Sequence, residues 1–350
     1  MPAVTRATAA TLRGSKASPA LAFFMRAWHS VVCVRTVARG CALSLLAGCG
    51  GTMPVSPELV PDPSSSRFTL RALPGEGTAV VQALHRAERV PPLRYRVIVV
   101  PGSGCAGMGA FAGRYFAGLQ HAQVLVLHKP GVSPQARKAP GDCPRAFVQH
   151  DRLSTWLAHA RAALRADALQ RQGLPPVPQL LVGISEGAEL LPALAPEVPH
   201  LAGLVLIASS GLDPQTAGAL QAQRLGVLPD WQAVGDEVAG RRPDTAVVQG
   251  RSLGYWRDLW RWRLTQPLLQ GPWPVLQVWG GDDALVPPAA YERFATLAAA
   301  RTMPHCARRI EQADHGLQGG AAGQDGVQRV WAWTEQWARS PAAGLCGPLQ

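Results

Sequence analysis

The sequence lacks several features that would assign it to a common functional class. It contains no CxxC pair and no His/Cys spacing typical of a structural metal site. It has no Lys/Arg run suited to tracking phosphates after residue 48, and no recognisable nucleic-acid module. Internal repeats are absent. We therefore expect no metal, no cofactor and no nucleic-acid partner.

The formal net charge of +11 is unevenly distributed along the 350 residues. Residues 1–48 carry six Lys and Arg and no acid, which leaves +5 for all the rest of the chain. The overall charge is therefore no argument for a polyanionic partner. Hydrophobic residues make up 47% of the chain, enough for the core of a large domain.

The N-terminal region has the pattern of a targeting segment. Arg35 and Arg39 precede an apolar run at 41–48, which is far shorter than the roughly 20 residues that a membrane-spanning helix needs. The run ends in Leu-Ala-Gly-Cys49, which resembles the lipobox of bacterial lipoprotein signal peptides. The resemblance implies cleavage before Cys49 and lipidation of that cysteine. An ordinary small-residue signal, or merely alanine-rich sequence, is the alternative.

We accordingly divide the chain into a signal region at 1–48, a flexible tether at 49–66, a domain at 67–341 and a tail at 342–350. A signal of this kind usually begins close to its basic residues, so Met25 is a candidate for the true start. The tether is rich in Pro and Ser, as flexible linkers often are. The expected location is the periplasmic side of a bacterial cell envelope, with membrane attachment through lipid on Cys49.

Four cysteines remain beyond the lipobox: Cys105, Cys143, Cys306 and Cys346. An even number suits disulfide bonding in an oxidising compartment, and three pairings are possible. We favour Cys105–Cys143 and Cys306–Cys346, because each pair then joins loops at a similar level of the expected fold. Unpaired buried thiols are the alternative.

The domain alternates short apolar runs with amphipathic segments. Strands are predicted at 94–100, 122–128, 179–184, 201–209, 275–280 and, more weakly, 307–312, after an antiparallel pair that flanks Pro74–Gly77. Helices are predicted at 151–168, capped by Asp151, and at 289–300 and 327–339. Strands that are apolar on both faces indicate an α/β fold, with a mostly parallel sheet and helices on both faces.

Residues 212–271 interrupt this alternation and predict a helical cap. The stretch contains Trp231, Trp256, Trp260 and Trp262, and it would lie over the carboxyl edge of the sheet, where open α/β folds bind ligands. These tryptophans either line a substrate pocket or pack the cap onto the body. Lys129 and the arginines at 251, 257, 261 and 263 either steer an acidic substrate or form a solvated face.

A possible nucleophile follows the strand at 179–184. Gly183-Ile-Ser185-Glu-Gly187 fits G-x-S-x-G at a predicted strand-to-helix turn, although Pro192 should shorten the helix. This motif resembles the nucleophile elbow of the α/β-hydrolase superfamily, in particular its serine esterases and lipases. The resemblance covers about residues 68–339 and implies the α/β-hydrolase fold, with Ser185 as the nucleophile.

The same resemblance implies a base and an acid in the order Ser, acid, His. His315 follows the last predicted strand, whereas His200 and His305 precede strands and so fall at the opposite edge of the sheet. For the acid, Gly280-Gly-Asp-Asp283-Ala-Leu-Val-Pro resembles the family's G-x-x-D-x-x-V-P stretch and selects Asp283. The remaining acids are given other roles: Asp213 is the alternative triad acid, and Asp282 and Asp314 are expected to be loop or solvated carboxylates.

The oxyanion hole of such an enzyme needs two preorganised donors. The backbone N–H of Glu186, next after the nucleophile, would supply one. Pro101–Gly107 resembles the glycine-rich oxyanion loop of esterases, with proline in place of the usual histidine, and implies Ser103 as the second donor, with Gly104 as the alternative. A phosphate loop is excluded because the Lys-Ser/Thr ending is missing.

These features together predict a lipid-anchored serine hydrolase of carboxylic esters or thioesters that uses an acyl-enzyme mechanism. A peptidase or a lipase with the same triad is an alternative. A different class is also open, namely a catalytically inactive hydrolase fold that serves as an envelope-binding module. The natural substrate and the oligomeric state do not follow from the sequence.

Overall fold

The computed structural model describes residues 67–138, 142–319 and 325–347. The predicted signal region, Cys49 and the predicted tether lie outside the described residues. Within the described ranges, none of the helices is both long enough and apolar enough to cross a membrane.

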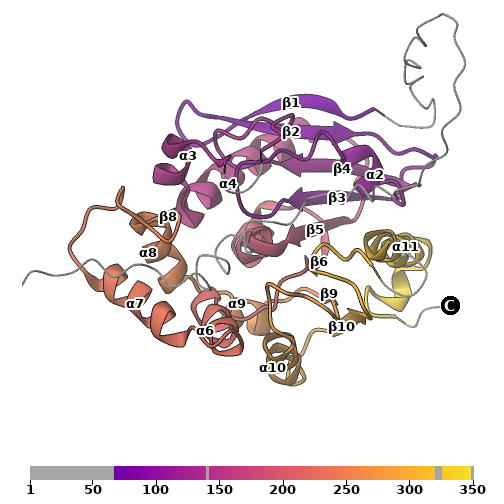
Figure 1. Ribbon diagram of the computed structural model, residues 1–350. Helices are drawn as coiled ribbons and strands as arrows, with labels where there is room; N and C mark the ends of the chain where they lie inside the picture. Colours follow the sequence, from indigo (N-terminus) through magenta and orange to yellow (C-terminus); the bar gives the residue numbers. More distant parts are fainter. Residues whose placement is uncertain (1–66, 139–141, 320–324, 348–350) are drawn as a thin grey trace, which may run out of the picture.

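The described chain forms one eight-stranded sheet in the order β1-β2-β4-β3-β5-β6-β9-β10 (Figure 1). The pairs β1–β2 and β2–β4 are antiparallel, and the remaining neighbours are parallel. The strands are β1 Thr69–Pro74, β2 Val80–Arg86, β3 Tyr95–Val100, β4 Ala122–Leu127, β5 Gln179–Ile184, β6 Leu201–Ile207, β9 Val275–Gly280 and β10 His305–Ile310.

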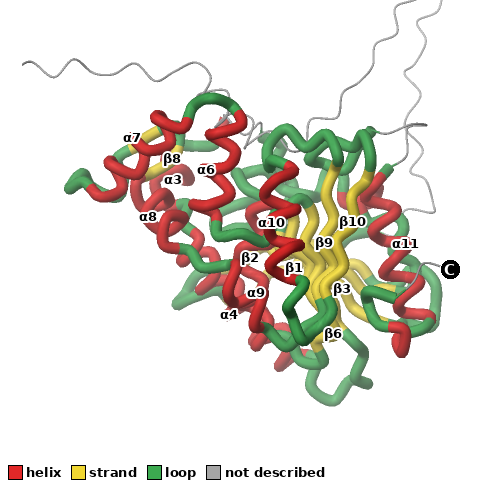
Figure 2. The backbone as a smooth tube through the Cα atoms, turned by 90° about the horizontal axis from the view of Figure 1, so that it is seen from below, coloured by secondary structure: helices red, strands yellow, loops and turns green. Residues whose placement is uncertain are grey.

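Helices cover both faces of the sheet, so its central strands are buried on both sides (Figure 2). Alternate residues of a strand point to opposite faces, and in β3 Ile98 packs with Trp156 of one face while Val99 packs with Trp331 of the other. The helices of the first face are α4 (Leu153–Gln170), α5 (Leu191–Leu194) and α10 (Pro288–Ala298), and those of the second are α2 (Ala112–Tyr115) and α11 (Gly326–Arg339).

The segment between β6 and β9 forms a mainly helical insertion, seen beside α3 (Arg145–His150) in Figure 1. Its elements are α6 Pro214–Arg224, α7 Leu228–Ala239, β7 Val247–Val248, β8 Arg251–Ser252, α8 Leu253–Arg261 and α9 Thr265–Gln270. Trp231 stacks on Trp260 with ring centroids 4.6 Å apart and meets Trp256 edge-on. The indole N–H of Trp262 donates to the backbone oxygen of Glu189. These contacts favour the packing interpretation of the four tryptophans.

The start of α4 differs from the expectation. The helix begins at Leu153, the N-cap residue is Arg152, and its side chain makes no capping hydrogen bond. The first-turn amide of Ser154 donates instead to Oδ2 of Asp258, at 2.8 Å. Asp151 instead forms buried ion pairs with Lys129 and Arg251. The prediction of Asp151 as a helix cap is wrong, because its carboxylate pairs with two buried cations, and Asp258 accepts from the first turn in its place.

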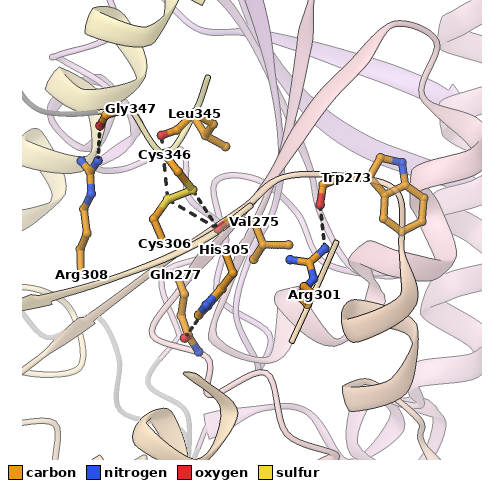
Figure 3. The surroundings of a disulfide bond; sticks show 10 residues. All are labelled: Trp273, Val275, Gln277, Arg301, His305, Cys306, Arg308, Leu345, Cys346 and Gly347. Carbon is orange, nitrogen blue, oxygen red and sulfur yellow. Dashed lines mark hydrogen bonds between the residues drawn. A yellow bond between two sulfur atoms is a disulfide. The ribbon is translucent and has the colours of Figure 1, made fainter. Parts of the chain in front are cut away.

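Both favoured disulfides are present, with Cα atoms 5.7 Å apart for Cys105–Cys143 and 5.4 Å apart for Cys306–Cys346. The second bridge joins β10 to the C-terminal segment, and Figure 3 shows Leu345 and Gly347 beside it. Leu345 is only 4% exposed. The bridge therefore holds residues near the C-terminus against the sheet. Structural disulfides are consistent with a location outside the cytoplasm.

Candidate active site

Ser185 is the first residue after β5 and has a backbone φ of +51°, a conformation that residues other than glycine seldom adopt. The chain continues as a 3-10 helix at Ser185–Leu190, the short α5, and a second 3-10 turn at Ala195–Glu197. Pro192 does not end the helical segment: it lies in the first turn of α5, where proline is tolerated, at the point where the 3-10 helix gives way to α-helix. A strained serine at such a turn projects its oxygen above the sheet edge.

The two glycines that flank Ser185 are required by close packing. A Cβ at Gly183 would lie 2.3 Å from the Cα of Ala188, and a Cβ at Gly187 would lie 2.2 Å from the backbone oxygens of Val100 and Pro101. Real Cβ atoms do not approach heavy atoms so closely. The glycines therefore let the turn lie against its own helix and against the end of β3.

Of the three residues expected to form the triad, His315 lies between the other two and within hydrogen-bonding distance of each. His315 Nε2 is 3.0 Å from Ser185 Oγ, and His315 Nδ1 is 2.8 Å and 2.9 Å from the two carboxylate oxygens of Asp283. His315 is 6% exposed and Asp283 is 2% exposed. They come from three different loops that follow β5, β9 and β10, because the carboxyl ends of parallel strands meet at one edge.

Asp283 has further donors that the sequence did not reveal. The amides of Leu285 and Val286 donate to Oδ1, and the Tyr291 hydroxyl donates to Oδ2 at 2.8 Å. Burial would raise the pKa of Asp283, but His315 and the two amides outweigh burial and lower the pKa from its ordinary value. Tyr291 lies on α10, and only the packing of that helix brings it to the carboxylate.

The alternative acids and bases lie elsewhere. Asp213 accepts hydrogen bonds from the amides of Leu264 and Thr265 and pairs with Arg263. Asp282 is exposed, and Asp314 accepts from the amides of its own loop. His305 contacts Gln277 at the opposite end of β10, beside the C-terminal disulfide (Figure 3).

The loop after β3 lies directly against the serine. A Cβ at Gly102 would be 3.7 Å from the Cβ of Ser185, and Ser103 follows Gly102 in the chain. The Cys105–Cys143 disulfide anchors the loop, and the Met108 amide donates to Nε2 of His128 at 3.0 Å. Burial lowers the pKa of His128 to about 4, so its imidazole is neutral at pH 7 and can accept this bond.

A buried cluster of charged residues lies next to the serine: Lys129, Asp151, Glu186 and Arg251. The interpretation of Lys129 and Arg251 as groups that steer an acidic substrate, or as part of a solvated face, is wrong, because each side chain is 3% exposed and paired with carboxylates. From the sequence alone, a single basic residue gives no indication of the carboxylate with which it pairs in the folded protein.

Within the described residues, the same region contains one buried carboxyl oxygen without a hydrogen-bond partner. Glu189 Oε2 is buried and makes no hydrogen bond. Burial, together with the nearby charges of Glu186 and Asp213, raises the pKa of Glu189 well above its ordinary value. No group of His, Cys, Asp and Glu residues within the described chain has an arrangement that could hold a metal ion.

No protein-family model matches the chain, and no curated protein sequence matches it significantly. Solved structures do match it. Est1E from Butyrivibrio proteoclasticus aligns with a TM-score of 0.53 at 17% identity, covering 78% of this chain and 99% of that one. The esterase domain of a Rhodothermus marinus protein aligns with a TM-score of 0.50 at 19% identity, covering 78% and 98%.

A puromycin-hydrolyzing peptidase from Mycobacterium tuberculosis aligns with a TM-score of 0.53 at 18% identity, covering 82% of this chain. The match spans only 42% of that peptidase. At such identities these likenesses concern the fold alone. Together with the strand order, they show the expected α/β-hydrolase fold: a mostly parallel sheet with helices on both faces.

Proposed function

We propose that the protein is a serine hydrolase that cleaves a carboxylic ester or thioester through a covalent acyl-enzyme. The observation that carries the proposal is the row of hydrogen bonds from Ser185 through His315 to Asp283. A serine hydroxyl is a weak nucleophile at its own pKa, so it needs a base within hydrogen-bonding distance and an acid that orients that base.

In the proposed reaction, His315 Nε2 accepts the proton of Ser185 as Oγ attacks the substrate carbonyl. The backbone N–H groups of Glu186 and Ser103 stabilise the resulting oxyanion, and Gly104 is the alternative to Ser103. His315 then protonates the leaving alcohol or thiol, and an acyl-enzyme remains. A water molecule activated by the same imidazole attacks this ester, and the carboxylic acid leaves.

Asp283 would act by holding the imidazole and stabilising its charged form. Its lowered pKa keeps it ionised at neutral pH, and its contact with Nδ1 fixes the tautomer in which Nε2 is free to take the serine proton. Tyr291 and the two loop amides would keep the carboxylate in place while the charge on His315 changes.

The leaving group is not decided by the fold, because both esterases and a peptidase share it. Esters and thioesters are proposed first because the two esterases are matched over 99% and 98% of their length, whereas the peptidase is matched over only 42%. We also propose that the enzyme is attached to the periplasmic side of the cell envelope by lipid on Cys49. Palmitate labelling of the expressed protein, with Cys49→Ala as control, tests the anchor; an unlabelled wild type would refute it.

Labelling with a fluorophosphonate probe tests the activated serine. The wild type should be labelled, and Ser185→Ala and His315→Ala should not. A matched pair of carboxylate variants sharpens the assay: Asp283→Asn should slow labelling by about 10³- to 10⁴-fold, whereas Asp282→Asn should label at the wild-type rate because this side chain is exposed. Folded wild type that resists the probe would contradict the proposal and favour an inactive binding module.

A further inference from the structure

Four buried side chains beside the nucleophile form a closed ring of alternating charge. Lys129 Nζ lies 2.9 Å from Asp151 Oδ1 and 2.6 Å from Glu186 Oε1. Arg251 Nη1 pairs with Asp151 Oδ2, and Arg251 Nη2 lies 3.7 Å from Glu186 Oε2. Tyr255 also donates to Glu186 Oε2, at 3.4 Å. Glu186 Oε1 is therefore hydrogen-bonded by Lys129 and Oε2 by Tyr255, while Arg251 Nη2 faces Oε2 at ion-pair distance and makes no hydrogen bond.

The members of the ring come from four separate parts of the chain. Lys129 follows β4, Asp151 precedes α4, and Glu186 is the residue next to Ser185. Arg251 and Tyr255 both belong to the insertion. Arg251 lies on β8, which is beside α3 in Figure 1. The ring thus connects the insertion directly to the turn that carries the proposed nucleophile.

Aromatic rings cover both cations. Lys129 Nζ lies 4.5 Å from the ring centroid of Trp156, and Arg251 Cζ lies 4.4 Å from that of Tyr255. The two cations and two anions balance, so the ring holds no net charge in a region from which water is largely excluded. In such surroundings each charge interacts strongly with its neighbours, and these interactions fix the orientation of the charged side chains.

Stability alone does not account for this arrangement. Buried ion pairs can often be replaced by apolar residues of similar volume without loss of stability, because desolvation offsets the attraction. A charge ring does supply a fixed orientation for the carboxylate at its centre. The backbone N–H of that same residue, Glu186, is the proposed oxyanion donor, and an error of about 1 Å in such a donor can reduce the rate by about 10²-fold.

We propose that Lys129, Asp151 and Arg251 are positioning residues that orient Glu186, and that Arg251 makes the alignment of the oxyanion donor depend on the docked insertion. This inference rests on the proposed hydrolase function. None of the three touches the substrate; they act through the backbone of the residue after the nucleophile.

A double-mutant cycle tests the inference, with p-nitrophenyl acetate as the substrate. Arg251→Met and Glu186→Gln should each lower kcat by about 10- to 100-fold, a fraction of the 10²–10³ lost with a whole oxyanion donor, and should change KM by less than about 3-fold. Because Arg251 acts through Glu186, the double variant should be no slower than the slower single variant. Arg251→Lys should restore part of kcat.

A second arginine of the insertion provides the matched control. Arg257 pairs with Asp244 and donates to backbone oxygens within the insertion, so Arg257→Met should weaken the insertion while leaving kcat within about 2-fold of wild type. If Arg257→Met lowers kcat as much as Arg251→Met, or if the effects of the cycle multiply, the inference is overturned. Should Arg251→Met fail to fold, Asp151→Asn replaces it in the cycle, with the same expectation.

The outcomes also separate this inference from the proposed function. A wild type that is labelled by the fluorophosphonate probe and hydrolyses the ester supports the hydrolase function, whatever the cycle shows. Normal kcat in folded Arg251→Met and Glu186→Gln then refutes the positioning role alone. A wild type without label or turnover refutes both.

Discussion

Gly187 offers a direct test of how the proposed nucleophile is positioned. Replacing it with alanine adds a Cβ 2.2 Å from the backbone oxygens of Val100 and Pro101. An ordinary contact begins near 3.4 Å, so the turn and the end of β3 must separate by about 1.2 Å. Backbone atoms cannot rotate away as a side chain can. We expect Gly187→Ala to lose about 1–3 kcal/mol of unfolding free energy through overpacking.

The same displacement moves Ser185 relative to the loop of the proposed oxyanion hole. A shift of about 1 Å at a reacting group can lower the rate by about 10²-fold, so fluorophosphonate labelling of the folded variant should slow by that order. Urea unfolding followed by tryptophan fluorescence measures the stability. Gly113→Ala is the control, because this exposed helical glycine has no atom within 4 Å of the added Cβ. Wild-type stability and labelling in Gly187→Ala would refute the reasoning.

Three further predictions concern the groups around the site. Replacing Cys105 and Cys143 by serine should lower the free energy of unfolding by about 4 kcal/mol, given their separation of 38 residues; an unchanged denaturation midpoint would contradict it. Tyr291→Phe removes one donor from Asp283, and steady-state kinetics should show kcat reduced roughly 3- to 10-fold with KM unchanged, because one hydrogen bond contributes about 0.5–1.5 kcal/mol net and the other donors remain. His128 has a folded-state pKa of about 4 against 6.5 when unfolded, so the unfolded state takes up the proton first as the pH falls. The stability contributed by the neutral imidazole is therefore complete above pH 6.5 and declines by up to about 3 kcal/mol towards pH 4; denaturation across this range should show a smaller decline in His128→Gln.

The local pattern of apolar residues was sufficient to predict where most strands of the sheet lie along the chain. The runs at 179–184 and 275–280 are strands with the predicted bounds, because a buried parallel strand must be apolar on both faces and its length is limited by the sheet. The weakest run was misplaced: β10 begins at His305 rather than residue 307, since an edge strand with only one fully buried residue has little apolar periodicity. Both disulfide pairings also followed from the level of their loops in the expected fold.

Some residues of the candidate site were likewise predictable from the sequence, and others were not. Ser185, Asp283 and His315 could be predicted as a triad because each stands just after a strand in a recognisable local motif, and the carboxyl ends of parallel strands converge. Whether they carry out the chemistry remains a prediction. Tyr291 had no such motif, because its role depends on how α10 packs on the loop after β9.

The sequence by itself determined the order of the sheet strands along the chain and the tight turn that needs Gly183 and Gly187, since these depend on neighbours along the chain. Only the tertiary structure decided how the buried charges pair. Lys129 and Arg251 are separated by more than one hundred residues, and each looks like an ordinary surface cation until folding brings the carboxylates of Asp151 and Glu186 to it. Desolvation makes those pairings obligatory, and desolvation is a property of the folded interior rather than of any local stretch of sequence.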